Sequence, residues 1–170
     1  KDSMDRNTTG SNNVAVGVDT LQANTTGAEN VAVGEGALDA NTTASYNTAV
    51  GRSALTLNTT GAQNAGFGTY ALQANTTGAN NTAVGYQALD GNTTASNNTA
   101  VGYNSGVAVT TGTQNTIVGA LAADAMTTGQ NNVFVGYAAA GAGVVTGSSN
   151  IGIGVAALGP LTSGANNIAI

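Results

Sequence analysis

Residues 75–91 read N-T-T-G-A-N-N-T-A-V-G-Y-Q-A-L-D-G, and the pattern begins again at residue 92 with N-T-T-A-S-N-N-T-A-V-G-Y. Working outward from this stretch gives ten repeats, all 17 residues apart except for one spacing of 18. With the Asn of N-T-T as position zero, the repeats begin at Asn7, Asn24, Asn41, Asn58, Asn75, Asn92, Val109, Met126, Val144 and Leu161. A short fixed period is the signature of a solenoid, whose coils bury a core only by stacking.

Three positions of the repeat hardly vary. Position ten is Gly in every repeat that reaches it, and position nine is always β-branched or aromatic, from Val16 to Ile170. Position six is Asn throughout: Asn13, Asn30, Asn47, Asn64, Asn81, Asn98, Asn115, Asn132, Asn150 and Asn167. The repeat holds a strand signal at positions seven to nine, a second apolar pair at thirteen and fourteen, and turn residues between them. We therefore predict an all-β parallel β-solenoid of ten 17-residue coils, with two strand-like segments per coil and ~4.8 Å between coils.

Stacking turns each position into a column. We expect position nine and the leucines of position fourteen to form the internal apolar columns, and the Asn column to form a structural amide ladder. N-T-T-G suits a type I turn, and the Gly of position ten suits a positive φ. Position eight must then face outward, yet it is never polar, which predicts a face covered by a partner in a homotrimer. This expected assembly face is formed by Ala15, Ala32, Ala49, Ala83 and Ala100.

The chain divides into three parts by the quality of the repeat. Residues 1–6 are a charged lead-in or joint, residues 7–125 are regular repeats, and residues 126–170 are degenerate repeats of the same solenoid with the extra residue in a loop. The chain stops at position nine, and residues 1–6 precede position zero. Head-to-tail stacking into a filament could complete a coil across this joint.

Composition excludes several function classes. Charged residues make up 6% of the chain, the net charge is -5, and three basic residues cannot form a nucleic-acid-binding stripe. There is no His and no Cys, and no apolar run is long enough for membrane insertion. Asp39, Asp90 and Asp124 share position fifteen but lie ~14 and ~10 Å apart along the stack, wider than glycosidase carboxylate pairs. We expect no enzyme activity, no cofactor and no metal, and an exposed ion pair between Glu35 and Arg52.

Three surface features have a functional reading beside a structural one. Tyr86 and Tyr103 share position eleven and could contact a sugar, or be a solvent-facing aromatic pair. N-x-T sequons make these residues candidate glycosylation sites, and the alternative is that they are simply turn sequences: Asn7, Asn24, Asn41, Asn58, Asn75, Asn92, Asn80 and Asn97. Two threonine columns, Thr8 to Thr93 and Thr9 to Thr94, could order water as ice-binding arrays do.

The segments at 75–89 and 92–103 resemble the head repeats of trimeric autotransporter adhesins and related repeats of bacteriophage tail fibres, although this repeat is longer. That resemblance implies a left-handed parallel β-roll, commonly a homotrimer, on a cell surface or virion. We therefore expect a structural segment of an extracellular or virion fibre or adhesin. Its partners would be copies of itself, in a homotrimer or filament, and cell-surface glycans. The alternatives are an ice-binding solenoid and a carbohydrate-binding module.

Overall fold

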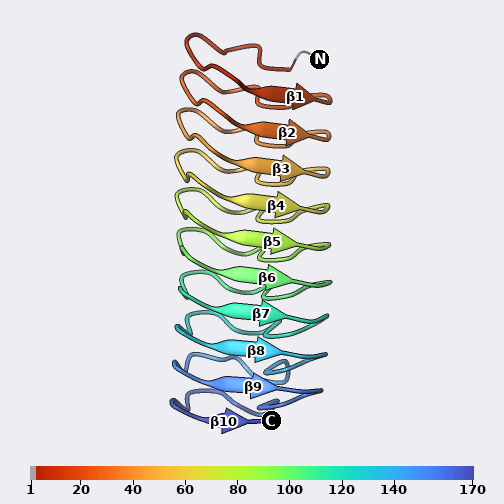
Figure 1. The fold of residues 1–170 in the computed structure, drawn as a ribbon, viewed down its shortest axis with the longest axis vertical. Coiled ribbons are helices and arrows are strands. Elements are labelled where there is room, and N and C mark those ends of the chain that lie inside the picture. The colour runs from red at the N-terminus through yellow and green to blue at the C-terminus, as the bar shows by residue number, and fades with distance from the viewer. Residues whose placement is uncertain (1–2) are drawn as a thin grey trace.

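The computed structural model describes residues 3–170 and contains ten short parallel strands in a single sheet (Figure 1). The strands are β1 (Val14–Val16), β2 (Val31–Val33), β3 (Thr48–Val50), β4 (Ala65–Phe67), β5 (Thr82–Val84), β6 (Thr99–Val101), β7 (Thr116–Val118), β8 (Val133–Val135), β9 (Ile151–Ile153) and β10 (Ile168–Ala169). Their order in the sheet is their order in the chain. The protein is thus an all-β parallel solenoid, and its described residues contain no helix.

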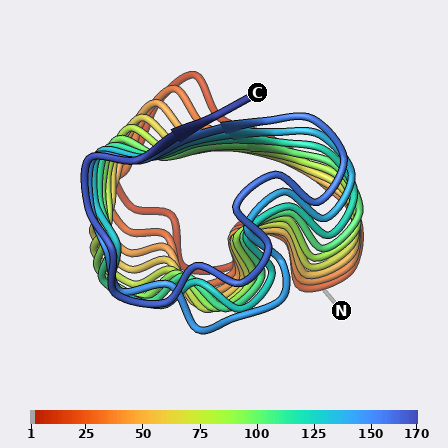
Figure 2. The same cartoon turned by 90° about the horizontal axis from the view of Figure 1, so that it is seen from below.

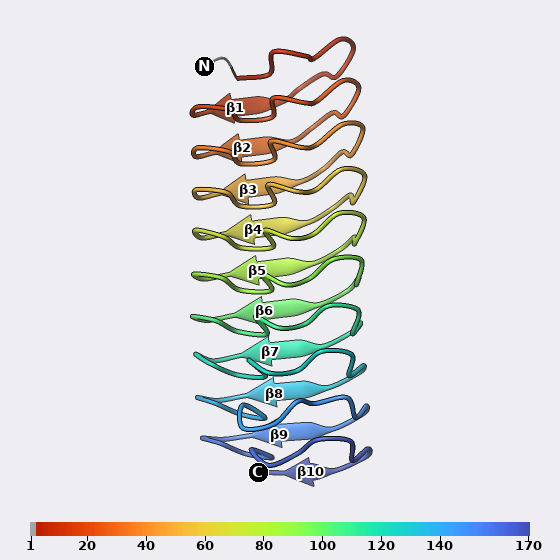
Figure 3. The same ribbon diagram turned by 180° about the vertical axis from the view of Figure 1, so that it is seen from behind.

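Neighbouring strands pair position for position, so equivalent residues of successive coils stack in columns. Phe67 of β4 lies beside Val84 of β5, which lies beside Val101 of β6. Figure 3 shows the opposite side of the solenoid, where the return path of each coil repeats from coil to coil. With ~4.8 Å between neighbouring strands, the ten strands span ~43 Å along the solenoid axis.

Each coil contains one strand, not the two strand-like segments predicted from the repeat. The second apolar pair, Ala88 and Leu89 in the coil of β5, is fully buried but lies in consecutive tight turns. The Asp90 N–H donates to the Gln87 carbonyl at 3.3 Å, and Leu89, third in that turn, has a φ of 52°. A left-handed backbone costs a non-glycine residue about 1–2 kcal/mol. Burial of the leucine side chain contributes about 1.5–3 kcal/mol and offsets that cost.

The strands direct position eight into the solenoid and position nine outward, which is the reverse of the predicted orientation. Ala83 and Ala100 are fully buried, whereas Val84 and Val101 are 38% and 37% exposed. The leucines of position fourteen, which are inside as predicted, fill the interior and leave little room over the strand. A Cβ at Gly66, the position-eight residue of β4, would lie 3.3 Å from the Ala71 carbonyl oxygen and 3.5 Å from the Leu55 Cδ1, so an alanine fits here with a small adjustment and a larger side chain does not.

The prediction that the position-eight residues form an assembly face is therefore wrong. Its residues line the core of their own chain: Ala32, Ala49, Ala83 and Ala100 are fully buried, and Ala15 is half-buried in the first strand. Their small size serves internal packing, because each sits against a leucine column, and it needs no second copy to explain it. Any contact between copies must use another surface.

Core volume is shared between position fourteen of one coil and position eight of the next. Gly106 stands where a leucine would be, and a Cβ there would come within 2.9 Å of the Ile117 Cδ1. One coil further on, Ala123 takes the leucine position and Phe134 is the buried strand residue. In these two pairs a small residue at position fourteen accompanies a large one at position eight, which keeps the interior filled, whereas in the following pair Ala140 and Gly152 are both small.

The Asn residues of position six form a continuous hydrogen-bonded ladder inside the coils. The Asn81 backbone N–H and Nδ2 both donate to the Asn64 Oδ1, at 3.0 and 3.1 Å, and Nδ2 also donates to the Ala95 carbonyl at 2.8 Å. Every Oδ1 from Asn13 to Asn150 accepts the backbone N–H of the next Asn. This column therefore joins all ten coils through Asn amides that are buried from Asn30 to Asn150.

The glycine of position ten is required by both conformation and space. Gly85 has a φ of 136°, in a region that L side chains rarely adopt. A Cβ at this position would also collide with the Gly102 carbonyl oxygen of the next coil. Stacked backbones at this corner leave no volume for a side chain.

The C-terminal coils depart from the common path where the sequence inserts a residue. Ala142 and Val144 are exposed in a loop before β9, and Val145, not Val144, takes the buried place of position zero. Figure 2, looking along the axis, shows coil outlines that shift gradually from one coil to the next and a blue loop that projects outward from them. The next residue, Thr146, resumes the regular pattern, because its N–H donates to the Thr162 carbonyl at 2.7 Å.

Candidate functional site

Candidate sites on this solenoid are surfaces. Residues 3–170 enclose no pocket, and among them no group of three His, Cys, Asp or Glu residues could hold a metal ion. The same residues include no helix that is long and apolar enough to cross a membrane. The features below are therefore rows of side chains that run across successive coils.

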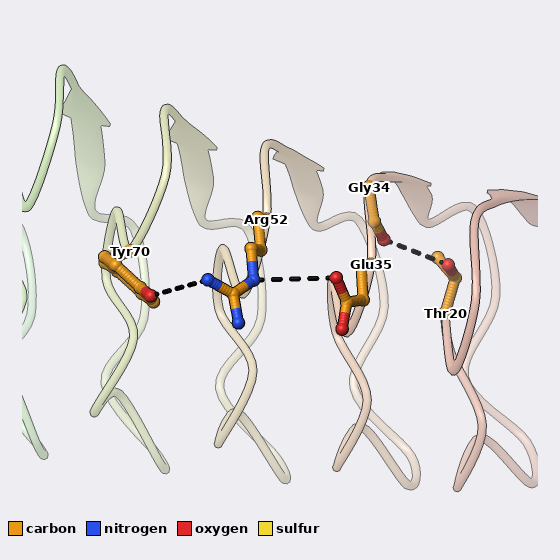
Figure 4. Close-up of polar contacts among 5 residues, drawn as sticks. All are labelled: Thr20, Gly34, Glu35, Arg52 and Tyr70. Atoms are coloured by element: carbon orange, nitrogen blue, oxygen red, sulfur yellow. Dashed lines mark hydrogen bonds and ion pairs between the residues drawn. The ribbon is translucent and has the colours of Figure 1, made fainter.

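A polar row follows the turns after β2, β3 and β4 (Figure 4). The Arg52 Nε lies 3.5 Å from the Glu35 Oε2, and the Arg52 Nη1 donates to the Tyr70 hydroxyl at 3.0 Å. The Arg52 guanidinium carbon is also 5.8 Å from the Tyr70 ring centroid. Both charged side chains are more than half exposed, so the ion pair contributes at most about 1 kcal/mol.

An aromatic row continues this polar row across the next two coils. The Tyr70 and Tyr86 centroids are 6.0 Å apart with the rings nearly perpendicular, and those of Tyr86 and Tyr103 are 5.6 Å apart with the planes 11° from parallel. That separation is typical of an offset stack, so Tyr86 and Tyr103 cover part of each other instead of lying side by side as a platform. The next residue of the position-eleven column is Ala120, whose small side chain does not continue the aromatic row.

Tyr70 was missed in the sequence because it occupies position twelve, one place later than the other tyrosines. Its φ of 62° places it in a turn with a left-handed backbone, which brings its ring beside the position-eleven column. Tyr137 shares position eleven but is separated from Tyr103 by the coil of Ala120, and it is 56% exposed. The structure thus groups three of the five tyrosines in one row, and Tyr46 and Tyr137 lie outside it.

The position-fifteen aspartates are partly buried and remain in separate coils. Burial raises the pKa of Asp90, and a hydrogen bond from Gln87 lowers it in part. Burial also raises the pKa of Asp124, against backbone hydrogen bonds that lower it. Asp39, in the same column, is half-buried. Each shift has a local cause, and none comes from a second carboxylate.

Most of the candidate glycosylation sites are buried in a second amide ladder that the sequence did not predict. The Asn75 Nδ2 donates to the Asn58 Oδ1 at 2.8 Å and to the Gly78 carbonyl at 3.0 Å, closing the N-T-T-G bend. The same pattern runs through Asn7, Asn24, Asn41, Asn58, Asn75 and Asn92, all fully buried except the half-buried Asn7. An amide nitrogen engaged in this way cannot carry a sugar in the folded chain, whereas Asn80 and Asn97 are exposed.

The second ladder ends at Asn92, because position zero of the next coil is the apolar Val109. The Asn92 Oδ1 is buried and has no hydrogen-bond partner, although the Asn92 Nδ2 still donates to the Asn75 Oδ1. Beyond it the column continues with the buried side chains of Val109, Met126 and Val145. A buried acceptor without a donor marks the point where the column changes from polar to apolar.

The two threonine columns differ in hydrogen bonding and in exposure. In the first column the Thr76 Oγ1 donates to the Thr93 carbonyl at 3.0 Å, and equivalent bonds run from Thr8 to Thr110. The first column therefore supports the stack, as does the bond from the Thr20 Oγ1 to the Gly34 carbonyl at 3.0 Å (Figure 4). The second column, which includes Thr77 and Thr94, is exposed.

Comparison of the chain with protein-family models, with curated proteins and with solved structures finds no match.

Proposed function

We propose that the chain is a structural segment of an extracellular or virion fibre or adhesin, with no catalytic role. The observation that supports this proposal is the position-six amide ladder, which links every coil from Asn13 to Asn167. In the N-terminal coils the second ladder, which ends at Asn92, and the threonine bonds add further side-chain links between coils that the sheet already joins. Such a rod resists bending and local opening, which are the properties that a fibre requires.

In this role the rod holds distant parts of an assembly apart, and its sides contact other copies and cell-surface glycans. The charged side chains are few, and those of Glu35 and Arg52 are paired with each other. The rod then works through its length and surface and needs no enclosed site.

Location tests this proposal most directly. Antibodies against the folded chain, applied to intact cells and particles of the source organism, are expected to decorate surface fibres in immunogold electron microscopy. A parallel sample opened with detergent controls for internal antigen. Label that appears only after opening would contradict the proposal.

A carbohydrate-contact site is a second candidate because the tyrosine row is exposed, with Tyr86 at 43% and Tyr103 at 54%. In the offset stack, ring edges and hydroxyls and the far face of Tyr103 remain available to a sugar. Glycan-array binding that is lost in Tyr86→Ala/Tyr103→Ala and kept in Tyr137→Ala would support it. Binding that survives the double substitution would remove it.

A further inference from the structure

The outward side of the sheet carries a row of apolar position-nine side chains that the described residues 3–170 leave partly or largely exposed. We define the outer strand face as positions seven and nine of the ten strands. Along position nine, Val16 is 57% exposed, Phe67 41%, Val84 38%, Val101 37% and Ile153 40%. The position-seven residues beside them are Val, Thr, Ala or Ile.

Charged residues are absent from this face. None of the ten strands in the described chain contains Asp, Glu, Lys or Arg. The charged residues of 3–170 all lie in the turns and loops, at Asp5, Arg6, Asp19, Glu29, Glu35, Asp39, Arg52, Asp90 and Asp124. The face thus carries no charge, and its apolar position-nine residues lie beside Thr at position seven in β3, β5, β6 and β7.

We propose that the outer strand face binds the same face of a second copy of this chain, sheet against sheet. The inference deepens the proposed function, on which it rests, by naming the surface through which copies associate sideways. This surface takes the place of the predicted position-eight assembly face, whose residues are buried in the core.

A second copy fits this surface because it has the same period. Side chains repeat every ~4.8 Å along the axis and every ~7 Å along a strand, so two such faces can interdigitate along their whole length, as in a dry zipper between sheets. A partner without this rung spacing would match it over only one or two strands. The lack of charge gives a nucleic acid or an anionic membrane no attraction to it.

The size of the face sets the expected strength. Strands of three residues are ~10 Å wide, and ten of them cover ~48 Å, or ~480 Å² on each partner. Two faces would bury about 1,000 Å² in all, the lower limit for a specific interface. We therefore expect reversible side-by-side association that becomes stable where many copies are held together in a fibre.

Sedimentation of the purified chain from about 1 µM to about 1 mM tests this inference. We expect a reversible dimer, and at least about tenfold weaker association in Val84→Lys/Val101→Lys, in which like charges would face each other across the contact. Thr77→Lys/Thr94→Lys places the same charges in the same two coils on the exposed threonine column, and it should dimerise like the unmodified chain. Circular dichroism of each variant checks that the fold is kept, and Val84→Thr/Val101→Thr is a milder substitution for use if the lysines unfold it.

Cross-linking locates the contact independently. Residue 101 lies near the middle of the outer strand face, so a short bismaleimide should join two Val101→Cys copies whether they run parallel or antiparallel. The Thr94→Cys variant should not cross-link. A chain that stays monomeric at the highest concentration, or a Val84→Lys/Val101→Lys variant that still dimerises, would overturn the inference. So would a monomer that inhibits ice recrystallisation through this face. None of these results affects the immunogold test of the proposed function.

Discussion

Replacing an Asn of the second ladder by Val should cost much more inside the ladder than at its end. Asn58→Val removes the donor to the Asn41 Oδ1 and the acceptor of one Asn75 N–H. The Gly61 carbonyl keeps its other donor, the Asn47 Nδ2, so two buried polar groups lose their partners.

Asn92→Val changes the number of unpartnered buried polar groups differently. It takes away the donor to the Asn75 Oδ1, but it also removes the Asn92 Oδ1, which already lacks a partner. The Ala95 carbonyl still accepts from the Asn81 Nδ2. The number of unpartnered buried groups is therefore unchanged, and the new valine sits next to Val109 in the apolar column.

The magnitude follows from this count. Each buried group left unpaired costs about 1–3 kcal/mol, so Asn58→Val should lower the free energy of unfolding by about 2–6 kcal/mol more than Asn92→Val. Asn75→Val, which also lies inside the ladder, is the matched control and should resemble Asn58→Val.

Urea denaturation followed by circular dichroism measures the difference, with hydrogen exchange of the Asn side-chain amides as a local readout. Because stacked repeats can unfold in stages, midpoints are compared at each site as well as extrapolated free energies. Losses for Asn58→Val and Asn92→Val that agree within about 0.5 kcal/mol would refute the reasoning, since that is the scatter expected for equivalent sites.

Three further expectations follow from the core, the corner glycines and the carboxylates. Gly66→Ile should destabilise the chain by about 1–3 kcal/mol through overpacking. Adding Leu55→Gly should recover part of that loss, which a double-mutant cycle in thermal denaturation would measure. Simply additive effects of the two substitutions would contradict the claim that the two positions share one core volume. Gly85→Ala should lower the melting temperature strongly while Thr77→Ala leaves it nearly unchanged; equal melting temperatures would contradict a required glycine. Burial holds the pKa of Asp90 above its ordinary value of 3.8, so the folded chain binds the proton more tightly than the unfolded chain, and stability should rise as pH falls from neutral toward about 4. Asp90→Asn should flatten this rise in urea midpoints measured against pH, and an unchanged slope would contradict the assignment.

The stacking and its register could be predicted from the repeat because the 17-residue spacing allows only one alignment of equivalent positions. The orientation of the strand could not. Because side chains alternate along a strand, positions eight and nine must face opposite sides. The larger residue at position nine favoured the interior for that position, which is wrong. A sequence signal for the right side does exist: Ile117 and Phe134 appear at position eight where position fourteen shrinks to Gly106 and Ala123.

Two local features oppose ordinary propensities and so escape prediction. Leu89 and its equivalents adopt positive φ, which bulky residues avoid, because three successive turns must fit into the return path of the coil. Gln87 also has a positive φ, of 53°. The buried second ladder looked like a turn sequence, although its replacement by Val109 and Met126 already indicated an interior column.

Strand orientation is the claim on which both the core and the outer strand face depend, and thiol labelling of Ala83→Cys and Val84→Cys tests it with two adjacent residues. We expect the Val84→Cys thiol to react rapidly in the folded protein and the Ala83→Cys thiol to react only after urea has unfolded the protein. Rapid labelling of Ala83→Cys with a protected thiol in Val84→Cys would contradict the account.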